Sequence, residues 1–357
     1  MFISSEGFMN RFQPWYCAWK ILSVLLLILF TMPFFAKADE IKRVVVIVTM
    51  PVPACEAHLK YFVAELKDLV QKDGQNMELS IIRANGDREF AEDQLRGILE
   101  KGTPDAVATI ATIASQAALN VLKDTNVPIF FFQVADPVGA GLIKNVGDKT
   151  GTNVTGRIFT VPAKVRTDLA MRLAGQAVSE KRAVRFGYIH STYPSAAGDI
   201  RALKTIEKQR KDIAFETYSI PYQKVPKGKP AMLAAVEDGI RAISDKVDFW
   251  WQPQGPLGEM AEYTRLLLTH STVPVVMGQT LESVKAGALM HITPDIQAGS
   301  RESAKLVHAI LKGYDPGKIR VTPPREFELG INLTTALKLN IVVPPDILDL
   351  AGDNVYR

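Results

Sequence analysis

Cysteine and excess charge are both scarce in this sequence of 357 residues. Cys17 lies within the first 38 residues and Cys55 is the only cysteine beyond them, so a chain without that segment has no internal disulfide. The formal net charge of +4 is small for this length, which argues against a nucleic-acid partner. The histidines lack metal-ligand spacing, and no Gly-x-Ser-x-Gly motif or phosphate-cradling loop occurs. We therefore expect no catalytic residue, no metal, no cofactor and no enzymatic activity.

A long hydrophobic run occurs only near the N-terminus. Residues 21–35 are nearly all apolar, with Arg11 and Lys20 ahead of them and Ala-Lys-Ala at 36–38 after them. A basic segment, an apolar core and a small-x-small site in this order are typical of a secretory signal peptide. The apolar core is shorter than the ~20 residues that a membrane-spanning helix needs, although a retained anchor is an alternative. We predict a signal peptide over residues 1–38 and a periplasmic mature protein.

Beyond residue 40, β-branched runs alternate with amphipathic segments. Residues 41–48 are typical of a strand buried on both faces, and residues 57–72 carry apolar side chains at helical spacing. The alternation continues toward the C-terminus and predicts an α/β fold of parallel sheets flanked by helices. We predict further strands at 79–82, 105–110, 129–134, 185–189, 215–220, 247–251, 275–277 and 326–331, and further helices at 90–101, 114–123, 163–178, 198–211, 231–244, 258–269, 300–312 and 336–340.

One short pattern occurs twice in the chain. Val-Pro at 127–128 precedes Ala-Gly at 140–141 by 13 residues, and Val-Pro at 273–274 precedes Ala-Gly at 286–287 by the same 13 residues. In both copies the Val-Pro opens an apolar run, and an Asp that leads into a strand-like run lies upstream. Two similar α/β halves predict a molecule of two lobes with a cleft between them.

The loops that follow the predicted strands are the candidate ligand site, because ligands of parallel sheets bind beyond the carboxyl ends of the strands. Thr112 and Ala114 lie in one such loop, where the free backbone N–H groups of a helix start would hold a carboxylate. Alternatively, Thr112 only caps that helix. Asp136 follows the fourth strand and would accept a hydrogen bond from a ligand ammonium, or else bonds within its own turn. Tyr193 offers an aromatic face for stacking, or simply shapes its loop.

Residues 136–142 (Asp-Pro-Val-Gly-Ala-Gly-Leu), followed by 153–156 (Asn-Val-Thr-Gly), resemble the signature of the substrate-binding proteins of one ABC-transporter family. That family includes binders of tryptophan and other aromatic amino acids. Residues 113–118, 284–289 and 344–348 resemble its other motifs, in the right order.

The resemblance implies a type I periplasmic-binding-protein fold, in which two Rossmann-like lobes with parallel sheets are joined by three crossover strands. On this basis we predict a first lobe of residues 39–157 plus 289–323 and a second lobe of residues 158–288 plus 324–357. It also implies that Ser195, a small polar residue, contacts the main-chain-like end of the ligand. Thr160 is a further candidate ligand-binding residue.

Three glutamines mark a departure from the family pattern. Amino-acid-binding relatives usually carry acidic and amide side chains in the loop that holds Gln252 and Gln254 here, and often Asp or Glu in place of Gln279. Neutral amides cannot offset a buried ammonium, whose lost hydration would then cost several kcal/mol. We therefore predict a neutral or anionic ligand, with aromatic solutes included, in preference to a free amino acid.

Taken together, these features predict an exported solute-binding subunit of an ABC importer, which would capture a small solute by hinge closure. Its expected partner is the ABC permease of the inner membrane, and we expect a monomer. A periplasmic sensing module that presents its ligand to a membrane signalling protein is the alternative. An exported enzyme would need a reactive constellation that these loops lack, and the leader argues against a cytoplasmic repressor.

Overall fold

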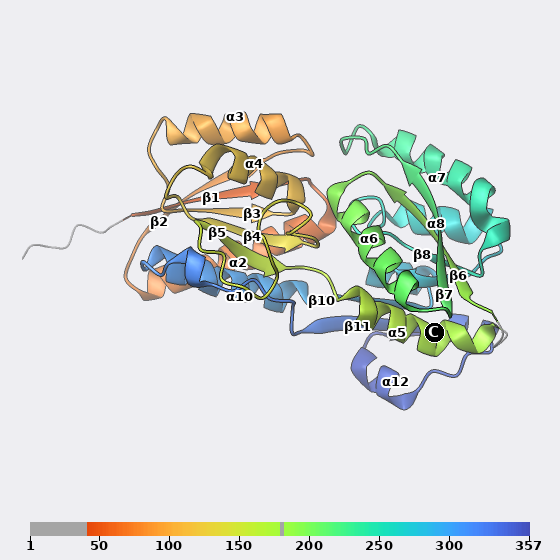
Figure 1. The fold of residues 1–357 in the computed structure, drawn as a ribbon. Helices are drawn as coiled ribbons and strands as arrows, with labels where there is room; N and C mark the ends of the chain where they lie inside the picture. Colours follow the sequence, from red (N-terminus) through yellow and green to blue (C-terminus); the bar gives the residue numbers. More distant parts are fainter. Residues whose placement is uncertain (1–40, 179–181) are drawn as a thin grey trace, which may run out of the picture. The chain divides into compact units, whose positions relative to one another are not determined.

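The computed structural model describes residues 41–178 and 182–357, and from Ile41 onward the chain forms one compact unit. The predicted signal peptide lies outside the described residues. The described strands form two separate sheets, one of five strands in the order β2-β1-β3-β4-β5 and one of seven in the order β12-β11-β10-β9-β8-β6-β7 (Figure 1). The predicted α/β architecture of two lobes is thereby confirmed. Among the described helices, none is long and apolar enough to cross a membrane.

The first lobe is a parallel sheet covered by two helices on each face. Its strands are β1 (Lys42–Val48), β2 (Met77–Arg83), β3 (Ala106–Ile110), β4 (Ile129–Val134) and β5 (Val154–Ile158). Its helices are α2 (Pro53–Lys72) and α10 (Ile296–Leu311) on one face, and α3 (Arg88–Leu99) and α4 (Thr112–Leu122) on the other. Because side chains alternate along a strand, Val44 and Val46 join the core under α2, while Val45 and Ile47 join the core under α3 and α4.

The second lobe has strands β6 (Val184–Ser191), β7 (Ile213–Ile220), β8 (Phe249–Trp251), β9 (Val275–Gly278), β10 (Met290–Pro294), β11 (Phe327–Asn332) and β12 (Val355–Tyr356). All neighbours pair in parallel except β10 and β11, which are antiparallel. Helices α7 (Lys229–Ile243) and α8 (Ala261–His270) contribute to the core on one face, and α5 (Ala163–Ala174), α6 (Pro194–Gln209) and α12 (Pro345–Ala351) to that on the other. The short helices α9 (Leu281–Ala286) and α11 (Leu333–Lys338) complete it.

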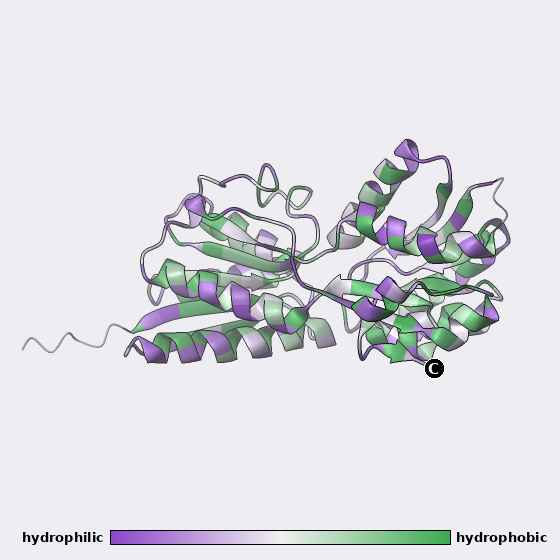
Figure 2. Ribbon diagram, turned by 90° about the horizontal axis from the view of Figure 1, so that it is seen from below, coloured by the Kyte–Doolittle hydropathy of each residue, from purple (hydrophilic) through white to green (hydrophobic). Residues whose placement is uncertain are grey.

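The burial pattern follows the strand and helix periods. Figure 2 shows hydrophobic residues along the strands and alternating hydrophilic and hydrophobic residues along the helices. Trp250 and Trp251 are both fully buried and belong to the cores on opposite faces of the second sheet, as neighbours on a strand must. Neither indole ring is therefore available to stack on a ligand.

The chain passes between the lobes three times, after β5, after β10 and before β11. The second passage comes later than the predicted boundary at residue 289. Residues 290–294 form β10, which pairs with β9 and β11 and so belongs to the second sheet. The chain reaches the first lobe only with α10, which packs against α2.

Candidate functional site

Four buried polar atoms without a hydrogen-bond partner line one pocket, here called the inner pocket. They are Gln133 Oε1, Tyr193 OH, Ser195 Oγ and Glu259 Oε2, half of the eight such side-chain atoms in the described part of the chain. Buried polar groups in folded proteins nearly always have partners, so four exceptions in one place require an explanation. The cavity volume of this pocket is about 40 Å³, less than the ~300–1,000 Å³ that is usual for small-molecule sites, so a solute held here must extend into the adjoining space.

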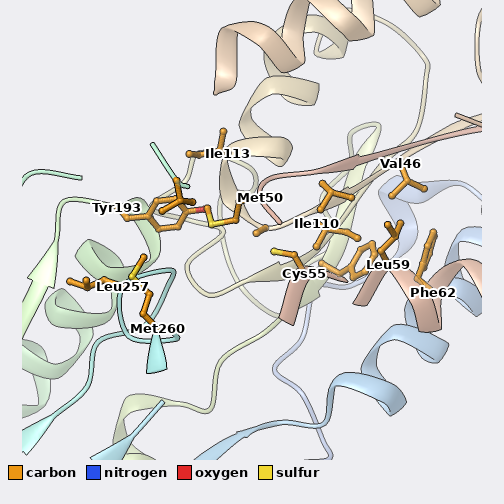
Figure 3. Close-up of a cluster of buried hydrophobic side chains, with 14 of the residues drawn as sticks. Val46, Met50, Cys55, Leu59, Phe62, Ile110, Ile113, Tyr193, Leu257 and Met260 are labelled. Atoms are coloured by element: carbon orange, nitrogen blue, oxygen red, sulfur yellow. The ribbon is translucent and has the colours of Figure 1, made fainter. Parts of the chain in front are cut away.

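Both lobes contribute walls to the inner pocket, and most of the walls are loops at the carboxyl ends of strands. The first lobe supplies residues near the starts of α2 and α4 and after β4, and the second supplies residues after β6, β8 and β9. Figure 3 shows the Tyr193 ring reaching from the second lobe toward Met50 of the first. The lining residues are Met50, Val52, Cys55, Ala111, Thr112, Gln133, Ala135, Phe159, Tyr193, Ser195, Gln254, Gly255, Pro256, Glu259 and Gln279.

The start of α4 differs from the prediction in two respects. Ala111, with a left-handed φ of 68°, is the N-cap, and no side chain caps the helix, so the alternative that Thr112 caps it is wrong. The backbone N–H of Ala114 is also not free, because it donates to Thr49 Oγ1 at 3.0 Å. Thr112 does line the pocket, and the first two N–H groups of the helix have no partner within it.

Asp136 and Thr160 line a separate hollow, which adjoins the inner pocket at Ala135. Asp136 Oδ1 accepts from the backbone N–H of Gly139 at 2.7 Å, and Oδ2 accepts from Arg201 at 2.9 Å. Both carboxylate oxygens are therefore engaged, which favours the turn interpretation over ligand contact. Thr160 Oγ1 accepts from Gln254 Nε2 at 3.0 Å, so the Thr160 side chain holds a pocket residue in place.

The three glutamines have different positions. Gln252 is fully buried and does not line the inner pocket, because its Nε2 donates to Thr264 at 2.7 Å and its Oε1 accepts from the backbone N–H of Gln279 at 2.8 Å. Its amide therefore joins its own loop to α8 and to the loop after β9 within the second lobe. Gln254 and Gln279 do line the pocket.

Glu259, the one carboxylate that lines the inner pocket, was not among the predicted site residues. The side chain is partly exposed as a whole, but its Oε2 atom is buried and has no partner. Burial raises the pKa of this carboxyl from 4.5 to about 7. The predicted preference for a neutral or anionic ligand required a pocket without a carboxylate, and that premise is wrong. An anionic ligand would here meet a group that carries like charge once it is ionised.

Two glycines determine the backbone conformation of the loop that carries Glu259. Gly255 has a left-handed φ of 91°, which glycine adopts without strain. A Cβ at Gly258 would lie 1.8 Å from the carbonyl oxygen of Pro253, so only glycine fits there. The loop therefore continues to Met260, and α8 begins at Ala261. No signal in the sequence pointed to Glu259, because it fell inside the helix predicted at 258–269.

The other ionisable groups of the inner pocket stay neutral near neutral pH. Burial raises the pKa of the Tyr193 hydroxyl well above its ordinary value, and the backbone of Ile113 opposes part of that shift. Burial also raises the pKa of the Cys55 thiol, with a further contribution from Glu259. Among the described residues, no group of His, Cys, Asp and Glu is arranged to hold a metal ion.

A wider opening adjoins the inner pocket and shares Glu259, Phe159 and Gln279 with it. This outer cleft has a volume of about 650 Å³ and is mostly apolar. Its charged groups include Lys229 and Glu262, which form an ion pair at 2.8 Å. The inner pocket therefore opens into a route that a small solute can follow.

Comparison with known proteins agrees with this architecture. The sequence model of a family described as ABC transporter substrate binding protein matches residues 43–171 and 264–355. A protein named "Tyrosine-binding protein" from Clostridioides difficile (strain R20291) is 26% identical over 306 residues, which cover 85% of this chain and 80% of that protein.

Solved structures share the fold. The ABC domain in complex with L-Trp from Streptococcus pneumonia aligns with a TM-score of 0.71 at 21% identity, over 88% of this chain and 99% of that one. The ligand-free, open structure of a substrate binding protein with adhesive properties from Clostridium difficile aligns with a TM-score of 0.61 at 22% identity, over 88% and 98%. Because the family model matches more than half of its residues, this chain belongs to the family of ABC transporter substrate-binding proteins.

Proposed function

We propose that this protein is the exported solute-binding subunit of an ABC importer and that it captures an amino acid, with aromatic ones the first to test, in the inner pocket. The observation that carries the proposal is the set of four unpartnered polar atoms, from both lobes, around one pocket. A polar ligand would supply the missing hydrogen bonds. The names of the relatives support an amino acid, because one is a tyrosine-binding protein and another was solved with L-Trp.

The pocket offers different groups to the two ends of an amino acid. The start of α4, an 11-residue helix, suits a carboxylate through the helix dipole and through the Thr112 N–H group, which has no partner within the helix. The Ser195 hydroxyl can donate or accept there. Met50, Val52 and Phe159 provide apolar walls for a side chain. A neutral or anionic solute without an amino group would leave the Glu259 carboxyl unmatched.

Closure of the lobes over the ligand is the proposed mechanism. Two rim ion pairs join the lobes, Lys224 to Asp87 at 2.7 Å and Arg201 to Asp136 at 2.9 Å. The two basic side chains are 60% exposed and the two carboxylates 29% and 34%, and such solvent-accessible pairs contribute at most about 1 kcal/mol each. A micromolar dissociation constant requires roughly 8 kcal/mol, so the contacts of the ligand itself must supply most of the stabilisation of the closed state.

Calorimetric titration of the protein, unfolded and refolded to remove bound ligand, tests ligand capture. We expect micromolar binding of L-tyrosine, L-tryptophan or L-phenylalanine. Ser195→Ala should weaken that binding, because it removes a pocket hydroxyl. Thr205→Ala is the matched control: it removes an exposed hydroxyl on the same helix, bonded only to the Arg201 carbonyl at 2.9 Å. No binding of any of the three by a folded protein would contradict the proposal.

Transport is tested separately, in cells. The mature protein should be found in the periplasm, and deletion of its gene should reduce uptake of whichever labelled amino acid binds in vitro. Undiminished uptake in the deletion strain, together with binding in vitro, would favour the sensing role instead. Restoration of uptake by the wild-type gene, but not by one encoding a variant that fails to bind, would tie transport to the pocket.

A further inference from the structure

Glu259 has an unusual setting for a carboxylate. It is the only acidic residue that lines the inner pocket, and none of the lining residues is a lysine, arginine or histidine. Its Oε2 atom is buried without a partner, and its pKa is affected by burial alone. A carboxylate removed from water without a compensating cation is costly in free energy. The glycine-dependent loop nevertheless holds it in that position.

A cation supplied by the ligand would remove this cost. The carboxylate is an acceptor on the second lobe, and Gln133 Oε1, another unpartnered acceptor, lines the same pocket from the first. An ammonium group has three N–H donors and no acceptor, which matches a carboxylate and an amide oxygen together. A hydroxyl ligand would offer one donor and no charge.

We propose that Glu259 is the specificity-determining residue that recognises the ammonium of the ligand and thereby rejects the corresponding deaminated acids. The inference rests on the proposed function, since it concerns the same pocket. The loop that usually holds an acidic side chain in amino-acid-binding relatives carries Gln252 and Gln254 in this chain. The carboxylate that pairs with the ammonium is therefore that of Glu259, further along the chain. Ligand binding then requires Glu259 in its ionised form.

Among the ionisable groups around the two cavities, Glu259 is the one whose protonation should change when the ligand binds. In the inner pocket, Cys55 and Tyr193 stay neutral because burial raises the pKa of each. In the outer cleft, burial lowers the pKa of His291 to about 4 and raises that of Glu328. The remaining acids of the outer cleft are paired, Glu262 with Lys229 at 2.8 Å and Glu282 with Lys285 at 2.6 Å.

The test compares L-tyrosine with desaminotyrosine, which lacks the amino group, on wild-type protein and on Glu259→Gln. The wild type should prefer L-tyrosine by at least about 30-fold, the range found when one partner of a buried charge pair is removed. The substitution should reduce this preference severalfold or more, mainly through weaker binding of L-tyrosine. Glu262→Gln is the matched control, an acid of the outer cleft already paired with Lys229, and should keep the wild-type preference.

A second measurement needs no variant and so does not depend on the folding of Glu259→Gln. Titration of wild type with L-tyrosine near neutral pH, in two buffers of different ionisation enthalpy, should show proton release, while desaminotyrosine should not cause it. The proposal is overturned if the wild type binds both ligands equally, if Glu259→Gln is folded and keeps the full preference, or if no proton is released. If none of the aromatic amino acids binds the wild type, it is the proposed function that fails.

Discussion

The affinity for an amino acid should depend on pH through Glu259. Burial raises the pKa of this carboxyl to about 7 in the ligand-free protein, whereas an amino acid keeps its ammonium well above neutral pH. Because the ionised carboxylate is the form that pairs with an ammonium, affinity should rise as pH increases through 7. Between about pH 6 and about pH 8 the dissociation constant for L-tyrosine should fall about tenfold, in proportion to the ionised fraction.

The stability of the ligand-free protein should change in the opposite direction. The folded pKa of Glu259 is raised, so its contribution to stability is fully present below about 4.5 and is lost as pH rises through about 7. The full shift corresponds to at most about 3 kcal/mol of unfolding free energy. Burial lowers the pKa of His58 to about 3 and of His291 to about 4, and these two groups act with the opposite sign below about 6.5. Comparison with Glu259→Gln, which retains both histidines, isolates the contribution of the carboxyl.

Calorimetry with L-tyrosine across this pH range measures the affinity, and thermal unfolding of the ligand-free wild type and Glu259→Gln measures the stability. At about pH 7, binding should release about half a proton, because about half of the Glu259 carboxyls are protonated beforehand. The difference in melting temperature between variant and wild type should grow with pH. A dissociation constant that is the same at both ends of the range, or a pH dependence that persists in folded Glu259→Gln, would refute the reasoning.

Two further substitutions test other parts of the structure. A Cβ at Gly198 would lie 2.6 Å from the Cβ of Asp136 in the other lobe, so Gly198→Ala should hinder closure and weaken ligand binding without lowering the melting temperature. Gly299→Ala, whose Cβ meets no atom within 4 Å, is the control, and calorimetry with small-angle scattering measures both effects. Arg166→Met should lower the unfolding free energy by about 3–5 kcal/mol, because it leaves Asp199 buried without its ion pair. A loss below about 1 kcal/mol in urea unfolding would contradict that expectation.

Most of the fold could be predicted because buried elements repeat with a regular period. The β1 run places alternate valines in two different cores, and adjacent Trp250 and Trp251 diverge for the same reason. Two helices too short to show a period escaped prediction. The α9 helix has six residues and α12 has seven, so each makes fewer than two full turns. Residues 290–294 were predicted within the first-lobe segment 289–323, whereas they form β10 and pair with β9 and β11, because pairing partners cannot be deduced from a short segment itself.

The candidate site could be located from the sequence but not described in detail. Tyr193, Ser195 and Gln254, which lie in loops at the ends of predicted strands, line a common pocket. The strand-end rule gives the position of a residue along the chain, however, and not the direction of its side chain. Gln252 turns inward because Thr264 and the backbone of the next loop satisfy its amide.

The division of the pocket between the lobes connects ligand specificity with closure. The start of α4 belongs to the first lobe, and Glu259 belongs to the second. An amino acid has a carboxylate for the former and an ammonium for the latter, so only the closed arrangement can satisfy both of its ends. A deaminated acid would contact the first lobe through its carboxylate and gain nothing from the approach of Glu259. On the proposed function, the residue that selects the ligand therefore also makes the closed state more stable with an amino acid than with a deaminated acid. Only a ligand with different contacts in the two states can shift the open–closed equilibrium.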